Sequence, residues 1–181
     1  VEKLDREGNP PTEFEVVTAM MFSYFAQVQP DFVVCEVGIG GLYDSTNIIT
    51  SPLAAIIATV AMDHANLLGP TIKDIAYQKA GIIKEGRPVI IGKLPSDAEK
   101  VVRQVAAEKD APVYALGKDF EIKIRPNGNH WGEKFNFSYH DLTFKDLKIG
   151  LLGDYQAANA ALSLMAFLLV AKEENEIQDL K

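Results

Sequence analysis

The chain contains 181 residues, a length that favours one main domain with a sizeable core. Hydrophobic residues account for 48% of the chain and charged residues for 24%, a composition typical of globular proteins and unlike that of disordered ones. The formal net charge is −7 and the basic residues are scattered, which argues against a nucleic-acid partner. The polar N-terminal residues lack a secretory signal, and no apolar run reaches the length that we expect of a membrane span. We therefore expect a cytoplasmic protein without a membrane partner.

The first predicted elements are a helix and two buried strands. Apolar residues recur at helical spacing from Pro11 to Gln27, and Thr12 stands three residues before Glu15 as in a capping box. The continuous apolar run from Phe32 to Val37 is typical of a strand that is buried on both faces of a parallel sheet. The stretch from Leu53 to Met62 is a second buried-strand candidate, although its alanines leave a helix possible.

Helices and strands are predicted to alternate through the middle of the chain. A helix from Thr71 to Ala80 is expected to end at Gly81. Three further elements follow it: a strand at Pro88–Ile91, a helix at Ser96–Lys109 with Ser96 as its N-cap, and a strand at Pro112–Leu116. Strands that alternate with helices imply right-handed crossovers, so we expect an α/β fold with a mostly parallel sheet flanked by helices.

The pattern changes after Gly117, where hydrophobic residues begin to alternate with a period of two. The three predicted strands are Phe120–Ile124, Lys134–Tyr139 and Leu142–Ile149. The dipeptide Asn127–Gly128 favours a turn between the first two of them. We therefore expect a small antiparallel β appendage over residues 118–150. A helix rich in Ala and Leu is expected from Gln156 to Ala171, with an acidic tail after it.

Three residues in the first half of the chain carry side chains suited to catalysis. Glu36 and His64 each follow a predicted buried strand, and the carboxyl ends of parallel strands are where ligands collect in open sheets. A carboxylate and an imidazole at that edge could meet at one metal ion. Taken singly, Glu36 is equally well explained as a solvated acid, His64 as a helix cap or a satisfied histidine, and Lys79 as a surface lysine.

Several short motifs, taken together and in this order, are more specific. They are Thr12-Glu13-Phe14-Glu15, Glu36-Val37-Gly38-Ile39-Gly40-Gly41, Asp44-Ser45-Thr46-Asn47, Asp63-His64, Leu68-Gly69 and Lys79-Ala80-Gly81-Ile82-Ile83. This set resembles the folylpolyglutamate synthase and dihydrofolate synthase family within the Mur-ligase superfamily, and the resemblance runs from about Thr12 to Ala161. It implies the fold of the Mur-ligase central ATPase domain for residues 1–181.

The resemblance implies an ATP-dependent ligase that adds glutamate to a folate. In this family the terminal carboxylate of the folate becomes an acyl phosphate, which the amine of glutamate attacks. Glu36 and His64 would bind Mg²⁺, and Lys79 would carry a carbamate. Addition of the first glutamate to dihydropteroate, the dihydrofolate synthase reaction, is left open by these residues.

The resemblance also implies where the substrates bind. The residues that would line the pterin site are Thr12, Glu13, Phe14, Glu15, Tyr43, Asp44 and Ser45. Asn159 would contact the adenine of ATP. Read without the resemblance, the same residues are a helix start, an ordinary turn and a helix N-terminus.

The sequence departs from the family pattern in two ways. Leu42 and Tyr155 stand where a polar residue and a histidine are common, which bears on substrate preference. No Gly-x-x-x-x-Gly-Lys-Ser/Thr loop is present, and the resemblance puts that loop before Thr12. We therefore expect an internal part of a longer enzyme, inactive when isolated, whose partners include the missing parts of the same polypeptide. The alternatives are another Mur-type amino-acid ligase, or a nonenzymatic binding module that lost the nucleotide loop.

Overall fold

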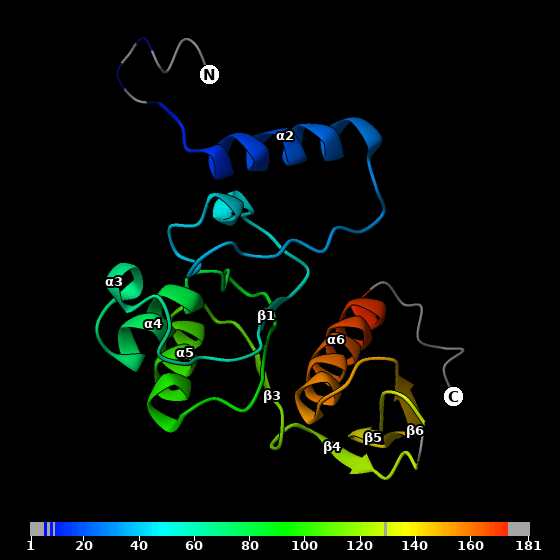
Figure 1. The fold of residues 1–181 in the computed structure, drawn as a ribbon. Coiled ribbons are helices and arrows are strands. Elements are labelled where there is room, and N and C mark those ends of the chain that lie inside the picture. Colours follow the sequence, from blue (N-terminus) through cyan, green and yellow to red (C-terminus); the bar gives the residue numbers. More distant parts are fainter. Residues whose placement is uncertain (1–5, 7, 9, 129, 174–181) are drawn as a thin grey trace.

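The computed structural model describes residues 6, 8, 10–128 and 130–173 (Figure 1). Its centre is a parallel sheet in the order β1-β2-β3, formed by β1 (Ala55–Ile57), β2 (Val89–Ile91) and β3 (Val113–Ala115). Helices α4 (Ile72–Ala80) and α5 (Ser96–Glu108) cover one face of this sheet, and α6 (Asp154–Glu173) covers the other. The expected α/β fold with a parallel sheet flanked by helices is confirmed.

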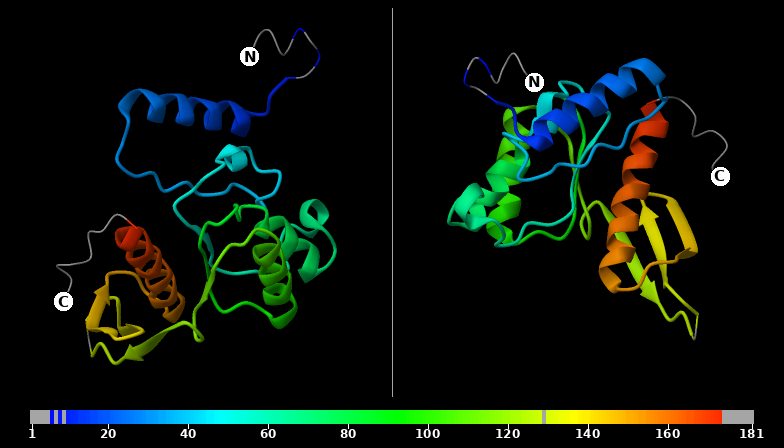
Figure 2. Two further views of the ribbon diagram at one scale, coloured as in Figure 1. Left: turned by 180° about the vertical axis from the view of Figure 1, so that it is seen from behind. Right: turned by 45° about the horizontal axis from the view of Figure 1, so that its top comes forward.

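A second, antiparallel sheet lies on the far side of α6 (Figure 2). It has the order β4-β5-β6, with β4 at Phe120–Arg125, β5 at Glu133–Tyr139 and β6 at Leu142–Ile149. The predicted period-two strands are confirmed to within a residue or so, because turn signals and alternation are local properties of the chain. Helix α6 contacts both sheets and joins them.

Two apolar cores meet at the central strand β2, whose three residues are all fully buried. Val89 and Ile91 face α4 and α5, while Ile90 faces α6, since successive side chains of a strand point to opposite faces. Other members of the first core include Ile75, Ala76, Ala80, Ala98, Val102 and Ala106. Other members of the second include Phe120, Phe135, Phe137, Ala161, Leu162 and Met165.

Helix α2 (Glu13–Val28) lies apart from the sheet and packs over the short 3-10 helix η1 (Ser45–Ile48) (Figure 1). Its start is the predicted capping box: the Thr12 hydroxyl accepts a hydrogen bond from the Glu15 backbone, and the Glu15 carboxylate accepts one from the Thr12 backbone. Two polar caps therefore fix where α2 begins. A further one-turn helix, α3 (Ala65–Leu68), packs on α4.

The prediction of a buried strand at residues 32–37 is wrong. The segment forms no regular strand and has no strand partner among the described residues, and Phe32 and Val34 are 64% and 99% exposed. A strand needs a neighbour that takes up its backbone hydrogen bonds, which local composition cannot supply. Glu36 consequently does not stand at the end of a strand.

Two other expectations need smaller corrections. Only Ala55–Ile57 of the candidate strand 53–62 is regular, because β2 pairs with those three residues alone. Ser96 is the first residue of α5 and not its N-cap, since Pro95 holds the extended cap position and makes no side-chain cap bond. Proline fixes only φ, which is −54° at Pro95, and the ψ of 142° there keeps this residue outside the helix. The acidic tail beyond residue 173 lies outside the described residues.

Helix α6 changes one conclusion drawn from composition. Residues 154–171 are long and apolar enough to cross a membrane when judged by length and composition alone, so the expectation that no run qualifies is wrong by that criterion. The structure gives another reason for their apolar character, because Ala157, Ala161 and Met165 are fully buried between the two sheets. Burial on two sides is what makes a core helix apolar around most of its circumference.

Candidate functional site

The loop after Glu36 is docked on the C-terminal turn of α4 at very short range. The Leu42 N–H donates to the Gln78 carbonyl at 2.8 Å. A Cβ on Gly81 would lie 2.4 Å from the Leu42 Cα, and a Cβ on Gly41 would lie 2.7 Å from the Gln78 carbonyl oxygen. Only glycine allows two backbones to approach this closely. The glycines of both motifs therefore hold the loop against the turn that carries Lys79.

Two polar side chains lock the same loop. The Asn47 amide donates to the carbonyls of Leu42 and Gly81, at 3.1 and 3.2 Å, and so joins the loop to α4. Asp44 caps η1 by accepting from the Thr46 N–H, and its other oxygen accepts from the Ile39 N–H, both at 2.9 Å. Burial raises the pKa of Asp44, but these hydrogen bonds outweigh it and hold the pKa below its ordinary value.

A cavity of about 320 Å³ opens between α2, this loop and α3. Six of the seven residues expected at a pterin site line it, namely Thr12, Phe14, Glu15, Tyr43, Asp44 and Ser45, and Glu13 is outside the lining. The other lining residues are Ile39, Leu67, Leu68 and Gln78. Two segments some thirty positions apart in the sequence thus form one cavity because α2 packs on η1.

The cavity combines apolar walls with carboxylates that accept hydrogen bonds from the protein itself. The Phe14 ring lies against the backbone of Gly38, where a Cβ would come within 2.5 Å of the ring. One Glu15 carboxylate oxygen accepts from the Thr12 N–H at 2.7 Å and from its hydroxyl at 2.9 Å, and these bonds lower the Glu15 pKa. Tyr43 is 85% exposed at the rim. A flat, partly apolar ligand fits this arrangement.

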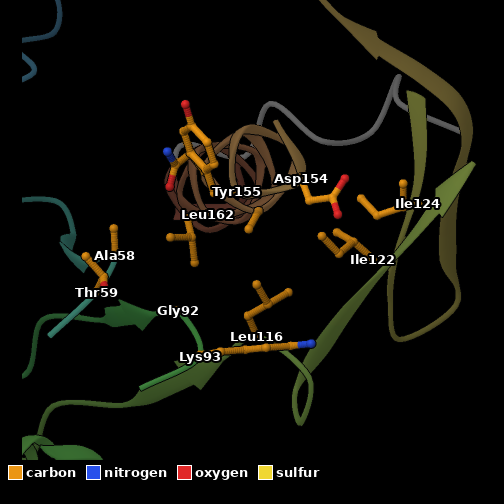
Figure 3. Close-up of a pocket in the computed structure, with 12 residues that line it drawn as sticks. Ala58, Thr59, Gly92, Lys93, Leu116, Ile122, Ile124, Asp154, Tyr155 and Leu162 are labelled. Atoms are coloured by element: carbon orange, nitrogen blue, oxygen red, sulfur yellow. The ribbon is translucent and has the colours of Figure 1, made fainter. Parts of the chain in front are cut away.

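A larger cavity, of about 620 Å³, lies beyond the carboxyl ends of the parallel strands (Figure 3). Thr59 follows β1 and Lys93 follows β2, while Asp154, Tyr155 and Asn159 line it from the first turns of α6. Asn159, the expected adenine contact, is therefore in a cavity at the edge where ligands of such sheets collect. Sequence reasoning missed Thr59 and Lys93, although a polar residue just after a buried strand was an available signal.

The two expected metal ligands lie in neither cavity. Glu36 and His64 are both exposed, and His64 has a left-handed backbone with φ of 50° at the N-cap of α3. Its ring nitrogen is 3.6 Å from the Asp63 carboxylate. Within the described part of the chain, no three His, Cys, Asp or Glu residues are grouped closely enough to hold a metal ion. That Glu36 and His64 share one metal stays a prediction.

Lys79 is half-buried in the last turn of α4, one residue after Gln78 of the smaller cavity. Its side chain has no hydrogen bond or ion pair with any residue that the structure describes. An amine without a partner carboxylate is chemically free to react as a nucleophile once it is deprotonated. Carbamylation of Lys79 is compatible with this setting and stays a prediction.

The comparisons with known proteins agree with the fold. The chain is 41% identical over 175 residues to a dihydrofolate synthase/folylpolyglutamate synthase of Bacillus subtilis (strain 168), which covers 96% of this chain and 40% of that protein. The apo form of the Lacticaseibacillus casei folylpolyglutamate synthase superposes with a TM-score of 0.89 at 41% identity, covering 96% of this chain and 42% of the other. A folylpolyglutamate synthase–AMPPCP–folate complex gives the same TM-score, identity and coverage.

The chain thus spans well under half the length of the relatives that it matches. The family model of the Mur ligase middle domain matches residues 5–167. The match includes every helix and strand that lines the two cavities, apart from the end of α6. The chain belongs to the Mur ligase middle domain family.

Proposed function

We propose that this chain is the central part of a cytoplasmic ATP-dependent ligase that adds glutamate to a folate through an acyl phosphate. The observation that carries the proposal is the smaller cavity, in which six residues of two distant motifs come together. Identity of 41% to a dihydrofolate synthase/folylpolyglutamate synthase supports the same substrate class. Dihydropteroate is a second acceptor that this cavity would admit, because it carries the same pterin ring.

The two cavities divide the substrates between them. The pterin of the folate would stack against Phe14 and the apolar side chains of α3, and the amide of Asn159 would contact the adenine of ATP. ATP binding also draws support from the related complex that contains AMPPCP and folate. The terminal carboxylate of the folate must then reach the γ-phosphate, so the chemistry would occur between the two bound substrates.

Magnesium fits the chemistry of the available donors. Glu36 and Asp63 offer exposed carboxylates, and Mg²⁺ held together with nucleotide phosphates needs only one or two protein ligands because it keeps several waters. We propose Glu36 and His64 as those ligands; the imidazole is an unusual ligand for Mg²⁺, and the family resemblance is the reason to include it. The bound Mg²⁺ would offset charge on the phosphates. A carbamate on Lys79 would turn a cation into an anion that could support a second metal ion.

The reaction balances without further cofactors. A carboxylate oxygen of the folate attacks the γ-phosphorus and ADP leaves. The free amine of glutamate then attacks the acyl carbon, phosphate leaves with the bonding pair, and the nitrogen loses a proton to give the amide. The contribution of this chain is to hold both substrates in register and to exclude water from the acyl phosphate.

The test is an amide-forming assay on the full-length polypeptide that carries this chain, with ATP, Mg²⁺, tetrahydrofolate and labelled glutamate. We expect ATP-dependent turnover that Lys79→Ala lowers by about 100-fold or more, since it removes a charged group from the reacting phosphates. Small carboxylates should restore part of that loss. Lys73→Ala, an exposed lysine on the same helix, is the matched control and should retain turnover.

The rival functions give different results in the same assay. Turnover with an amino acid other than glutamate, or with a peptidoglycan precursor as acceptor, would indicate another Mur-type ligase. Pteroylglutamate binding without any ATP consumption would indicate a nonenzymatic binding module. Normal turnover by Lys79→Ala would exclude the carbamate.

A further inference from the structure

Gln78 is a cavity residue to which no role has been given so far. It is half-buried in the last turn of α4 and lines the smaller cavity. Its backbone carbonyl accepts from the N–H groups of Leu42 and Gly81, at 2.8 and 3.2 Å, so the position of its Cα is fixed from both sides. Its side-chain amide, in contrast, makes no hydrogen bond within the described part of the chain. No buried side-chain nitrogen or oxygen among the described residues lacks a partner, so the Gln78 amide reaches solvent, and a ligand in the cavity can take the place of that water.

The other polar groups of this cavity are largely engaged with the protein. One Glu15 oxygen is shared by the backbone and hydroxyl of Thr12, and both Asp44 oxygens accept from the loop backbone. The hydroxyls of Tyr43 and Ser45 make no hydrogen bond with the described residues, but each carries its donor and its acceptor on one oxygen atom. Among the side chains of the lining, Gln78 has a donor and an acceptor on two neighbouring atoms.

The Gln78 side chain lies beside Gly40 of the loop and next to Leu68. Gly40 has φ of 69°, and a Cβ there would lie 3.7 Å from the Gln78 Cβ and 4.0 Å from its side-chain oxygen. The same Cβ would collide with the Leu68 side chain at 2.7 Å. Glycine at position 40 is therefore needed for the close approach of Leu68, while the Gln78 side chain lies beside it at ordinary contact distance, so an apolar surface stands next to a hydrogen-bonding one.

We propose that the Gln78 carboxamide is a specificity-determining group that pairs with the pyrimidine edge of the bound pterin. A 2-amino-4-oxopteridine presents an N–H donor beside a carbonyl acceptor, and a carboxamide is the complementary pair. Sites that hydrogen-bond a ligand edge reject analogues that lack it, because the protein groups are then left unpaired. The inference rests on the proposed pterin site and adds the residue that recognises the pterin ring by hydrogen bonding.

The experiment measures equilibrium binding of two probes to the full-length polypeptide. The first probe is pteroylglutamate, and the second is the analogue in which a naphthyl group replaces the pterin, so that ring stacking is kept and edge hydrogen bonds are removed. We expect the wild type to prefer pteroylglutamate, and Gln78→Met to reduce that preference by about tenfold while its naphthyl affinity stays within about twofold. Methionine keeps the length and unbranched shape of glutamine. Gln104→Met, at an exposed position on α5, is the matched control and should keep the wild-type preference.

The possible failures are separable. If Gln78→Met weakens both probes by the same factor, Gln78 acts only on the shape of the cavity and the inference is wrong. An unchanged preference would also overturn it, while leaving the proposed function intact. Absence of pteroylglutamate binding by the wild type would instead refute the proposed function on which the inference depends. Thermal unfolding midpoints of the variants identify any loss that is due to misfolding.

Discussion

Replacing Gly81 with alanine tests whether the close crossing between the loop and α4 holds the site together. Gly81 has an ordinary helical backbone, with φ of −59° and ψ of −17°. Alanine at such a position would by itself stabilise the fold by about 0.4–1 kcal/mol, because it restricts the unfolded chain. The sign of the effect therefore depends on the contact and not on the backbone conformation.

The contact is too short to accept a methyl group. The new Cβ would lie 2.4 Å from the Leu42 Cα and 2.8 Å from its nitrogen, whereas carbon atoms in contact are about 3.5–4.0 Å apart. The loop would have to move by about 1 Å, at a cost of about 1–3 kcal/mol for overpacking. Such a movement also weakens the Leu42–Gln78 hydrogen bond, which contributes about 1 kcal/mol. We expect a net destabilisation of about 2 kcal/mol.

Urea unfolding of the 181-residue chain, followed by circular dichroism, measures this change at constant denaturant slope. Gly150→Ala is the control, since no atom lies within 4 Å of the Cβ that it would add. That variant should be neutral or slightly more stable. If Gly81→Ala unfolds at the same urea concentration as the wild type or higher, the loop does not cross α4 as described, and the argument that the glycines position Lys79 fails.

Two further predictions concern the same loop. Asn47→Ala removes the amide that joins the Leu42 and Gly81 carbonyls, so we expect the free energy of unfolding to fall by about 1–2 kcal/mol; a change below about 0.3 kcal/mol would mean that water replaces the amide. The pKa of Asp44 is lowered in the fold, so the stability that it contributes is present above its ordinary value of 3.8 and is lost as the pH falls below it. The free energy of unfolding of the wild type should accordingly fall more than that of Asp44→Asn between about pH 6 and about pH 3. Equal losses in urea titrations would mean that the hydrogen bonds accepted by the Asp44 carboxylate do not stabilise the fold.

Patterns that depend on neighbours in the chain were predicted well. The capping box at Thr12 and the antiparallel strands of residues 120–149 follow from spacing of a few residues, which the sequence displays directly. The resemblance also placed Thr12–Glu15 and Tyr43–Ser45 at one site, and six of these seven residues line one cavity. That this cavity binds a pterin stays a prediction. What the residues do inside the cavity was not predictable, because Asp44 turned out to hold the loop with both oxygens.

Amino-acid order alone established the α/β class, the change to antiparallel strands and the motifs of the family, since periodicity and turn chemistry are local. Tertiary structure decided the rest. The run at residues 32–37 has strand composition yet lacks a partner strand, and hydrogen bonding between strands depends on chain that is remote in sequence. Gln78 and Lys93 line the two cavities because of how their elements pack: α4 packs against the loop of residues 38–44, and β2 packs against α6. The sequence next to each residue does not show this, since the packing of the element that carries a side chain decides which site it lines.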